Sequence, residues 1–256
     1  MFRRAIVRPP AENLADGLTT VALGRPDFTL ALAQHGTYCQ ALEACGLELL
    51  SLPPDSHHPD ATFVEDTAVV TDRCAILCRP GAPSRLGEVA GVRDAILRGC
   101  SVVHEIEPPG TLDGGDICDA GRRFLIGISH RTNEEGAAQL SRFLSATGYT
   151  SSTVDIRGMK SILHLKSGIA YLDKNHLVIM EELAGRKEFA DFNRIPLTAE
   201  ESYACNCVLV NGRVLVAAGF PFVTAELVRR GYAPLPIEMS EFRKMDGGLS
   251  CLSLRF

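Results

Sequence analysis

The stretch Cys205-Asn-Cys-Val-Leu-Val-Asn-Gly-Arg-Val-Leu-Val-Ala217 decides the fold, because it places an Asn-Gly pair between two apolar runs. Asn-Gly in this setting is the strongest short-range signal for a β-hairpin. Three further segments have two apolar runs about a short polar turn, and these turns lie at residues 71–73, 119–122 and 173–175. The four hairpins start roughly 40–50 residues apart, which is typical of a repeat architecture.

Helical patterns and short strands lie between the hairpins. Apolar residues at helical spacing predict helices over residues 27–44, 88–98, 133–147 and 224–230. Thr132 and Glu135 have the spacing of a capping box at the start of the third helix, and Gly148 is a plausible stop for it. Short strands are predicted after the helices, at residues 47–52, 102–106, 152–156 and 233–237. The repeating unit is therefore a hairpin, a helix and a strand.

The two ends of the chain complete the repeat. Residues 249–256 form a strand with no second half after it, and residues 4–8 form a strand with no first half before it. If these two pair, they make a fifth hairpin that closes a ring of five units, each of about 50 residues. Closure would also remove exposed edge strands. We therefore predict an α/β fold, a closed five-fold propeller-like ring forming one domain over residues 1–256. An open α+β sheet is the alternative.

Composition limits the classes of function. The 256 residues are 46% hydrophobic and 22% charged, as in ordinary globular proteins. The formal net charge of −5 and the lack of a Lys/Arg cluster argue against a nucleic-acid partner, and the mild acidity fits a cationic small molecule. No apolar run reaches the ~18–20 residues that span a bilayer, and no signal peptide is seen. The nine cysteines follow no disulfide framework, so we expect free thiols and a cytoplasmic protein.

Residues able to do chemistry recur at the start of each hairpin. In order along the chain they are Glu65, Asp66, Asp113, Asp116, His164, Asn206 and Cys251. In a pseudo-symmetric ring, equivalent positions face the same axis, so we expect a thiol, an imidazole and several carboxylates in one central pocket. Cys251 also follows Gly247-Gly248, which allow a ligand or another backbone to come close. A thiol beside a histidine and carboxylates can be a strong nucleophile.

Each of these residues also has an ordinary structural explanation. Cys251 alone fits a buried small hydrophobe, and His164 lies in an apolar stretch that suits a core histidine. The carboxylates fit a solvated strand end or a turn around Gly114-Gly115. Their joint placement at matching positions of the repeat favours a site. His57-His58 and Cys205-x-Cys207 lack the spacing of a zinc site, so no metal site is predicted.

Eight segments, in order over nearly the whole chain, resemble the dimethylarginine dimethylaminohydrolases of the guanidine-modifying (amidinotransferase, pentein) superfamily. The most specific are the runs FVED, RPGAPSR and LDGGD. The segments are Asp16-Gly-Leu-Thr19, Pro59-Asp-Ala-Thr-Phe-Val-Glu-Asp66, Arg79-Pro-Gly-Ala-Pro-Ser-Arg85, Gly110-Thr-Leu-Asp-Gly-Gly-Asp116, Arg131-Thr-Asn133, Leu163-His-Leu-Lys166, Asn206-Cys207 and Asp246-Gly-Gly-Leu-Ser-Cys251. The fold of that superfamily is a five-fold pseudo-symmetric α/β propeller, which agrees with the repeat.

The resemblance implies roles for individual residues. Cys251 matches the nucleophile, His164 the acid/base and Asp113 the third catalytic position. Asp66 matches the carboxylate that grips a guanidinium, and Arg85 and Arg131 resemble arginines near the substrate's carboxylate. Further substrate contacts are implied for Leu18 in a covering loop, Asp60, Phe63, Glu65 and Met245. Cys205 stands where the family leads us to expect alanine, which would add a thiol near the site.

The implied activity is hydrolysis of asymmetric dimethylarginine and monomethylarginine to citrulline and dimethylamine or methylamine, through a covalent Cys-thiouronium. It implies a small-molecule substrate, no cofactor and no nucleic-acid or membrane partner, and it allows a homodimer. One alternative is an arginine deiminase, which usually carries a helical insertion for which 256 residues leave no room. The other is a non-catalytic propeller, as in the ribosome anti-association factor of related fold.

Overall fold

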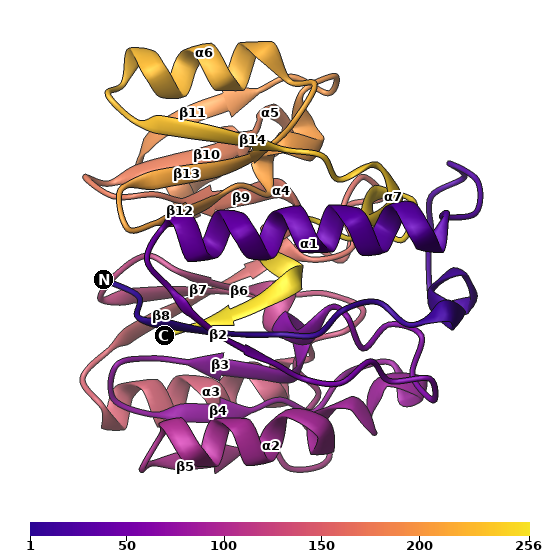
Figure 1. Cartoon of the computed structure of the whole chain (residues 1–256). Helices are drawn as coiled ribbons and strands as arrows, with labels where there is room; N and C mark the ends of the chain where they lie inside the picture. Colours follow the sequence, from indigo (N-terminus) through magenta and orange to yellow (C-terminus); the bar gives the residue numbers. More distant parts are fainter.

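The computed structural model describes residues 1–256 and contains five three-stranded sheets. In each sheet an antiparallel hairpin is extended by a third strand that runs parallel to the hairpin's second strand (Figure 1). The sheets are, in strand order, β15 (Ser253–Arg255), β1 (Arg4–Val7) and β2 (Glu48–Ser51); β3 (Ala68–Val70), β4 (Ala75–Leu77) and β5 (Val103–Glu105); β6 (Ile117–Asp119), β7 (Arg123–Ile128) and β8 (Thr150–Asp155); β9 (Ile169–Tyr171), β10 (His176–Met180) and β11 (Asn193–Leu197); β12 (Val208–Val210), β13 (Arg213–Ala217) and β14 (Ala233–Ile237).

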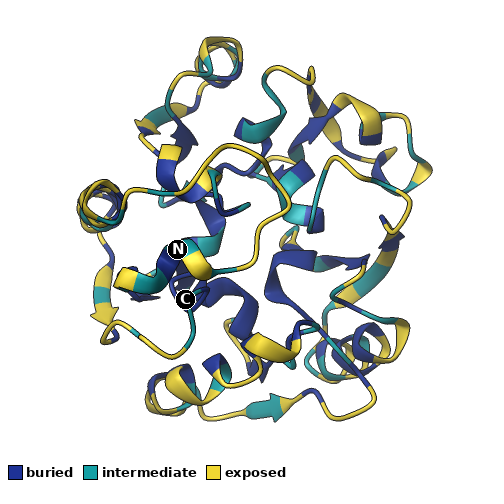
Figure 2. Ribbon diagram, turned by 90° about the vertical axis from the view of Figure 1, so that its right-hand side faces the viewer, coloured by how far each residue is buried: buried dark blue, intermediate teal, exposed yellow.

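A helix connects the second and third strands of every sheet. These helices are α1 (Phe28–Ala44), α2 (Glu88–Gly99), α3 (Glu134–Ala146), the one-turn α5 (Glu181–Ala184) and α6 (Pro221–Arg229). In Figure 2 the exposed faces of helices lie toward the rim, whereas the strands around the centre are buried. Apolar residues of neighbouring sheets and of the inner helix faces form the core; α1, for example, contributes Ala31, Tyr38 and Leu42.

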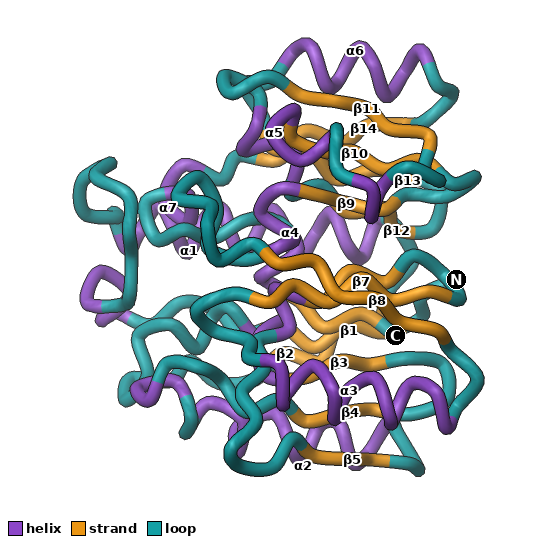
Figure 3. The backbone as a smooth tube through the Cα atoms, turned by 180° about the vertical axis from the view of Figure 1, so that it is seen from behind, coloured by secondary structure: helices purple, strands orange, loops and turns teal.

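The ring closes through the two chain ends. β15 pairs antiparallel with β1, with Ala5 opposite Arg255 and Val7 opposite Ser253. The Arg4 amide donates to the Phe256 carbonyl at 2.8 Å, and the Phe256 amide donates back to the Arg4 carbonyl at 3.0 Å. N and C accordingly lie side by side in Figures 1 and 3. The predicted five-fold ring is confirmed, and the open sheet is excluded.

A single helical turn precedes the first strand of each hairpin. The turns are η7 (Ser250–Leu252), η2 (Val64–Thr67), η4 (Gly114–Asp116), α4 (Leu165–Gly168) and η6 (Ser202–Cys205). The sequence pattern placed several of these residues in the strands themselves, and those strand starts were wrong. The turns contain Glu, Asp, Gly and Ser, which are poor strand formers, and their amides bond locally, as Asp66 does to the Phe63 carbonyl at 3.3 Å.

Two other predictions needed correction. The start of α3 is capped by Asn133, whose side chain accepts from the Gly136 amide at 2.8 Å; the Thr132 hydroxyl accepts from the Asp113 amide instead. The capping box was therefore wrong. The third strand of the fourth unit, β11, was not predicted, and it contains Pro196. β11 pairs only with β10, and proline is tolerated in such an edge strand.

Loops and short helices gather at the end of the ring opposite the chain termini, as α7 shows in Figure 3. They include η1 (Glu12–Asp16), η3 (Pro83–Arg85) and α7 (Ser240–Arg243), and η1 leads into an exposed loop over residues 17–25. A further turn, η5 (Lys187–Phe189), lies in the connection between α5 and β11. No helix in the structure is both long and apolar enough to cross a membrane.

Candidate active site

A small pocket of about 30 Å³ brings together most of the residues that the sequence singled out. It lies among η1, η2, α4 and the loop before η7. The lining residues are Leu18, Asp60, Phe63, Asp66, Arg85, Arg131, Leu163, His164, Met245, Asp246, Gly247 and Cys251. A thiol, an imidazole and carboxylates therefore meet here, as the repeat predicted.

His164 lies directly before α4 and is buried against carboxylates. Its Nε2 is 3.0 Å from Oδ2 of Asp113, whose other oxygen accepts from the Gly81 amide at 2.8 Å. Burial lowers the pKa of His164, but Asp66, the hydrogen bond to Asp113 and the nearby Asp116 together outweigh burial and raise it to about 9. The side chain is therefore an imidazolium at neutral pH, ready to give up a proton.

Asp66 is the carboxylate most firmly fixed in the pocket. Its Oδ1 accepts from the Gly115 amide at 2.8 Å, and its Oδ2 accepts from Nη1 of Arg85 at 2.5 Å. Burial raises the pKa of Asp66, but His164, Arg85 and the Gly115 amide lower it to about 2. A Cβ on Gly115 would lie 2.8 Å from both Asp66 Oδ1 and His164 Nδ1, so only glycine fits between them.

Cys251 lies in η7 and is partly exposed toward the pocket. The Gly248 amide donates to its Sγ at 3.4 Å. Burial raises the pKa of the thiol, Glu65 and Asp66 raise it further, and the result is about 12. The sulfur is therefore a thiol at neutral pH, and a bound cation would favour its ionisation.

The two arginines of the pocket differ in how they are held. Arg85 is buried, and its guanidinium donates to Asp66, to Glu88 and to the carbonyls of Asp60 and Phe63. No hydrogen bond from the side chain of Arg131 occurs in the structure. The guanidinium of Arg131 is thus the one available to a ligand anion, while Arg85 contributes charge from a fixed position.

The loop over residues 17–25 is fastened across the pocket by two carboxylates, and we call this segment the covering loop (indigo, at the right of Figure 1). Asp60 accepts from the Leu18 amide at 3.0 Å, and Asp246 accepts from the Thr20 amide at 2.5 Å. The covering loop therefore forms part of the pocket wall, through Leu18.

Several predicted residues lie elsewhere. Glu65 lines a larger cavity on the other side of the ring, and Asn206 packs against η7 without reaching the pocket. Asp116 is buried behind His164, where it accepts from the Leu165 amide at 3.0 Å. Cys205 is fully buried in the core, so the extra thiol expected near the site is not in the pocket.

The sequence reasoning missed Asp246 and the Gly248 amide. Asp246 has a left-handed backbone with a φ of 56°, which an Asp before Gly-Gly tolerates. That local pattern was the available signal, but it gives no indication that the carboxylate reaches a loop some 200 residues away in the chain.

Asp66, Asp113 and His164 also have the donor types of a metal site, with one atom of each within 4.8 Å of the others. Their polar atoms already have partners, because Asp66 binds Arg85 and the Gly115 amide while His164 binds Asp113. We therefore describe the group as a buried ion-pair network.

Comparison with known proteins places this site in context. Residues 92–203 match the family model described as arginine deiminase. The chain is 46% identical to N(G),N(G)-dimethylarginine dimethylaminohydrolase of Pseudomonas aeruginosa, over all of both chains. It is 38% identical to the protein of that name from Streptomyces coelicolor, covering 99% of this chain and 96% of the relative.

Solved structures agree with these matches. A cysteine-to-serine mutant of the Pseudomonas aeruginosa enzyme in complex with citrulline superimposes with a TM-score of 0.97 over all of both chains, at 46% identity. The N-terminal domain of the cyanobacterial arginine dihydrolase ArgZ, at 19% identity, shares the fold with a TM-score of 0.89 over 100% of this chain and 97% of its own. The full-length identity and the shared five-fold ring together show that this chain belongs to the dimethylarginine dimethylaminohydrolase family.

Proposed function

We propose that this protein hydrolyses asymmetric dimethylarginine and monomethylarginine to citrulline and dimethylamine or methylamine. The observation that carries the proposal is the convergence of Cys251, the imidazolium of His164 and the carboxylate of Asp66 in one covered pocket. Relatives at 46% and 38% identity that carry this activity in their names support it, as does the solved structure of one with citrulline.

Substrate binding follows from the charges that line the pocket. A guanidinium is planar and cationic, so the Asp66 carboxylate in the pocket wall holds it through charge-assisted hydrogen bonds, while Asp113 acts on it through His164. Arg131 pairs with the substrate's α-carboxylate, since its guanidinium has no other partner, and Arg85 adds positive charge behind it. Asp60 lies near the mouth, where it suits the α-ammonium group. Leu18, Phe63 and Met245 enclose the aliphatic chain.

The first half of the reaction forms a covalent intermediate. The bound cation lowers the proton affinity of Cys251, and the thiol proton leaves to solvent. The Sγ thiolate then attacks the central guanidinium carbon, forming a C–S bond. The C–N bond to the dimethylamino group breaks as His164 donates its proton to the departing nitrogen. Dimethylamine leaves, and a thiouronium remains on Cys251.

Water completes the reaction. His164, now neutral, accepts a proton from a water molecule that attacks the thiouronium carbon. The C–S bond breaks, the second proton of the attacking water leaves to solvent as the C=O group of citrulline forms, and the thiolate of Cys251 takes up a proton from solvent. His164 is again an imidazolium, so the cycle is balanced with water as the only co-reactant. No metal or organic cofactor takes part in any step.

Turnover of asymmetric dimethylarginine compared with unmethylated arginine tests the proposal. We expect citrulline and dimethylamine from the methylated substrate and at least about tenfold lower kcat/KM for arginine. Preferential conversion of arginine would instead support a deiminase, the activity named by the family model that matches residues 92–203. Absence of turnover with both compounds would reject hydrolysis and return attention to a binding role.

We further propose that the ring is a single domain over residues 1–256 and that the protein works in the cytoplasm. Every sheet packs on two neighbours through shared cores, which supports one cooperative unit. All nine cysteines are free in the structure, which suits a reducing compartment.

A further inference from the structure

The turns that carry the catalytic residues have two faces. Cys251 and Asp66 line the substrate pocket, whereas the preceding residues, Ser250 and Glu65, line a second cavity of about 320 Å³. The two cavities share no lining residue. A layer of buried polar side chains therefore lies directly behind the nucleophile, on the face that the substrate does not reach.

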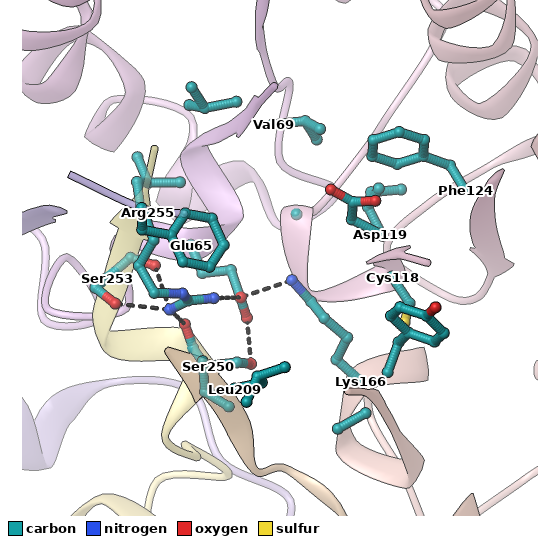
Figure 4. A pocket seen from close by; sticks show the side chains of 18 of the residues that line it. Glu65, Val69, Cys118, Asp119, Phe124, Lys166, Leu209, Ser250, Ser253 and Arg255 are labelled. Atoms are coloured by element: carbon teal, nitrogen blue, oxygen red, sulfur yellow. Dashed lines mark hydrogen bonds and ion pairs between the residues drawn. The ribbon is translucent and has the colours of Figure 1, made fainter. Parts of the chain in front are cut away.

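Glu65 is the centre of this layer, which Figure 4 shows from the second cavity. Its Oε2 accepts a hydrogen bond from the Ser250 hydroxyl at 2.6 Å. Its Oε1 lies 2.6 Å from Nζ of Lys166 and 3.5 Å from Nη2 of Arg255. Only 4% of the Glu65 side chain is exposed, so these contacts take place with little solvent screening. Together with Asn206, these side chains come from four of the five repeat units.

Asn206 fixes the backbone of the same turn. Its Oδ1 accepts from the Ser250 amide at 2.8 Å, and its Nδ2 donates to the Ser250 hydroxyl at 3.1 Å. The hydroxyl thus accepts from Asn206 while donating to Glu65, and its orientation is fully determined. A Cβ on Gly248 would lie 2.5 Å from Cγ of Asn206, so glycine at 248 lets Asn206 approach.

We propose that Glu65 and Ser250 are positioning residues that hold η7, and with it Cys251, from the side of the ring opposite the substrate. The resemblance had suggested a substrate contact for Glu65, but its carboxylate is engaged entirely on the far side. The inference rests on the proposed role of Cys251 as nucleophile. Ser250 transmits the constraint, and Lys166 and Arg255 pair with the buried carboxylate of Glu65.

The layer also acts on the sulfur through its charge. Glu65 favours the thiol form of Cys251 and Lys166 opposes it. The other titratable or charged groups around η7 are Asp66 from η2, His164 before α4, Tyr203 from η6, Arg255 from β15, and Asp60, Arg85, Arg131 and Asp246 across the pocket. Because Glu65 and Lys166 carry charges of opposite sign, removal of Glu65 should lower the pKa of Cys251 and removal of Lys166 should raise it.

Alkylation by iodoacetamide as a function of pH tests the charge effect without any substrate. Peptide mass spectrometry assigns the modified cysteine among the nine. In Glu65→Gln, which keeps an acceptor for Ser250, we expect the pH midpoint for Cys251 alkylation to fall. In Lys166→Met we expect it to rise. Midpoints that shift in the same direction in both variants, or in neither, would overturn the proposal. Disorder of the turn would change the midpoint in the same direction whether a negative or a positive charge were removed.

Steady-state kinetics of Ser250→Ala test the constraint on geometry. Loss of the hydroxyl frees η7, so kcat for dimethylarginine should fall about 10- to 100-fold while KM changes less than about threefold. Ser151→Ala is the matched control, since the Ser151 hydroxyl bonds only the Ser141 hydroxyl on α3, away from the layer; it should behave as wild type. A raised KM with unchanged kcat would place Ser250 or Glu65 in substrate binding and reject positioning. If wild type does not turn over dimethylarginine, the proposed function fails, and the alkylation shifts still decide the inference.

Discussion

At the scale of single residues, the surroundings of His164 and Cys251 raise the pKa of both side chains. The pKa of His164 is raised to about 9 by its carboxylate neighbours, which outweigh burial, and that of Cys251 is raised to about 12 by burial and by the charges of Glu65 and Asp66. At neutral pH, His164 is therefore an imidazolium and Cys251 a neutral thiol. A cationic substrate changes this balance, because its charge offsets the carboxylates next to the sulfur.

Replacing Cys251 with alanine should abolish turnover and leave the fold intact. Loss of a nucleophile typically costs about 10⁴-fold or more in kcat. Circular dichroism should be unchanged, because the side chain is small and partly exposed. Cys205→Ala is the control: its thiol is buried in the core, and the variant should retain activity. Citrulline formation by Cys251→Ala, or a covalent adduct on Cys205, would refute the assignment.

Replacing Asp113 with asparagine should shift the alkaline side of the pH–activity profile to lower pH. His164 must be protonated to donate to the leaving amine, so activity declines as pH rises through about 9. Asparagine removes the charge that stabilises the imidazolium, which lowers the pKa of His164. Measurement of kcat/KM between pH 6 and about 10 checks this, and a shift to higher pH would contradict it.

The same ion pair has a predictable effect on stability. Because the pKa of His164 in the folded state lies above its usual value of 6.5, the pair stabilises the fold fully below that pH. The contribution is lost as pH rises through about 9. Asp113→Asn should therefore reduce the pH dependence of the unfolding free energy between these values.

At the scale of secondary-structure elements, the covering loop is tied to the segment that leads into η7. Asp246 holds the Thr20 amide and hydroxyl, at 2.5 and 3.0 Å, from the loop that leads into η7. Asp246, which holds the covering loop, therefore lies in the loop directly before η7, the turn that contains Cys251.

Asp246→Ala should loosen the covering loop. With fewer bonds to hold the closed state, we expect KM for dimethylarginine to rise several-fold and thermolysin to cleave faster near Leu18, Val21 and Leu23, which are exposed. Asp16→Ala is a control, since its only ion pair is an exposed one with Arg25. Unchanged cleavage and KM in Asp246→Ala would show that the loop is held by other contacts.

Turn chemistry and apolar periodicity, which recur in each unit, were sufficient to predict the hairpins, the ring closure and the meeting of Asp66, His164 and Cys251. The other expected pocket residues came only from the resemblance to the family; they are Leu18, Asp60, Phe63, Arg85, Arg131 and Met245. The sequence was insufficient where tertiary contacts decide local structure. The turns before the strands were assigned as strand because apolar neighbours surround Glu65 and Asp66. Which of two adjacent carboxylates faces the substrate depends on the rotation of η2, and periodicity carries no information on that rotation. Asn133 replaced Thr132 as the cap because Thr132 is needed by Asp113.

At the scale of the whole molecule, the last strand closes the ring. Leu254 is buried between β1 and the sheet of β3, and Phe256 completes the ladder to Arg4. η7, which carries Cys251, immediately precedes this strand. Loss of residues 253–256 should therefore disturb the ring closure and the position of Cys251 together.

Deletion of residues 253–256 should prevent stable folding. It removes the hydrogen bonds of β15 with β1, exposes the edge of β1 and takes Leu254 from the core, a loss of about 2–5 kcal/mol from that side chain alone. Wild type should unfold in one transition, as a single domain does, by both circular dichroism and fluorescence. A folded, active truncation, or two separate transitions in wild type, would contradict this account.

Pairing of β1 with β15 also means that the ring has no intrinsic beginning. Met1 and Phe256 end side by side at the same edge where the other four hairpins make their turns. A peptide link between the two ends would convert this seam into a fifth ordinary hairpin turn. New termini opened at Asn211-Gly212 would then give a circularly permuted chain with the same five sheets and with Cys251 in mid-sequence.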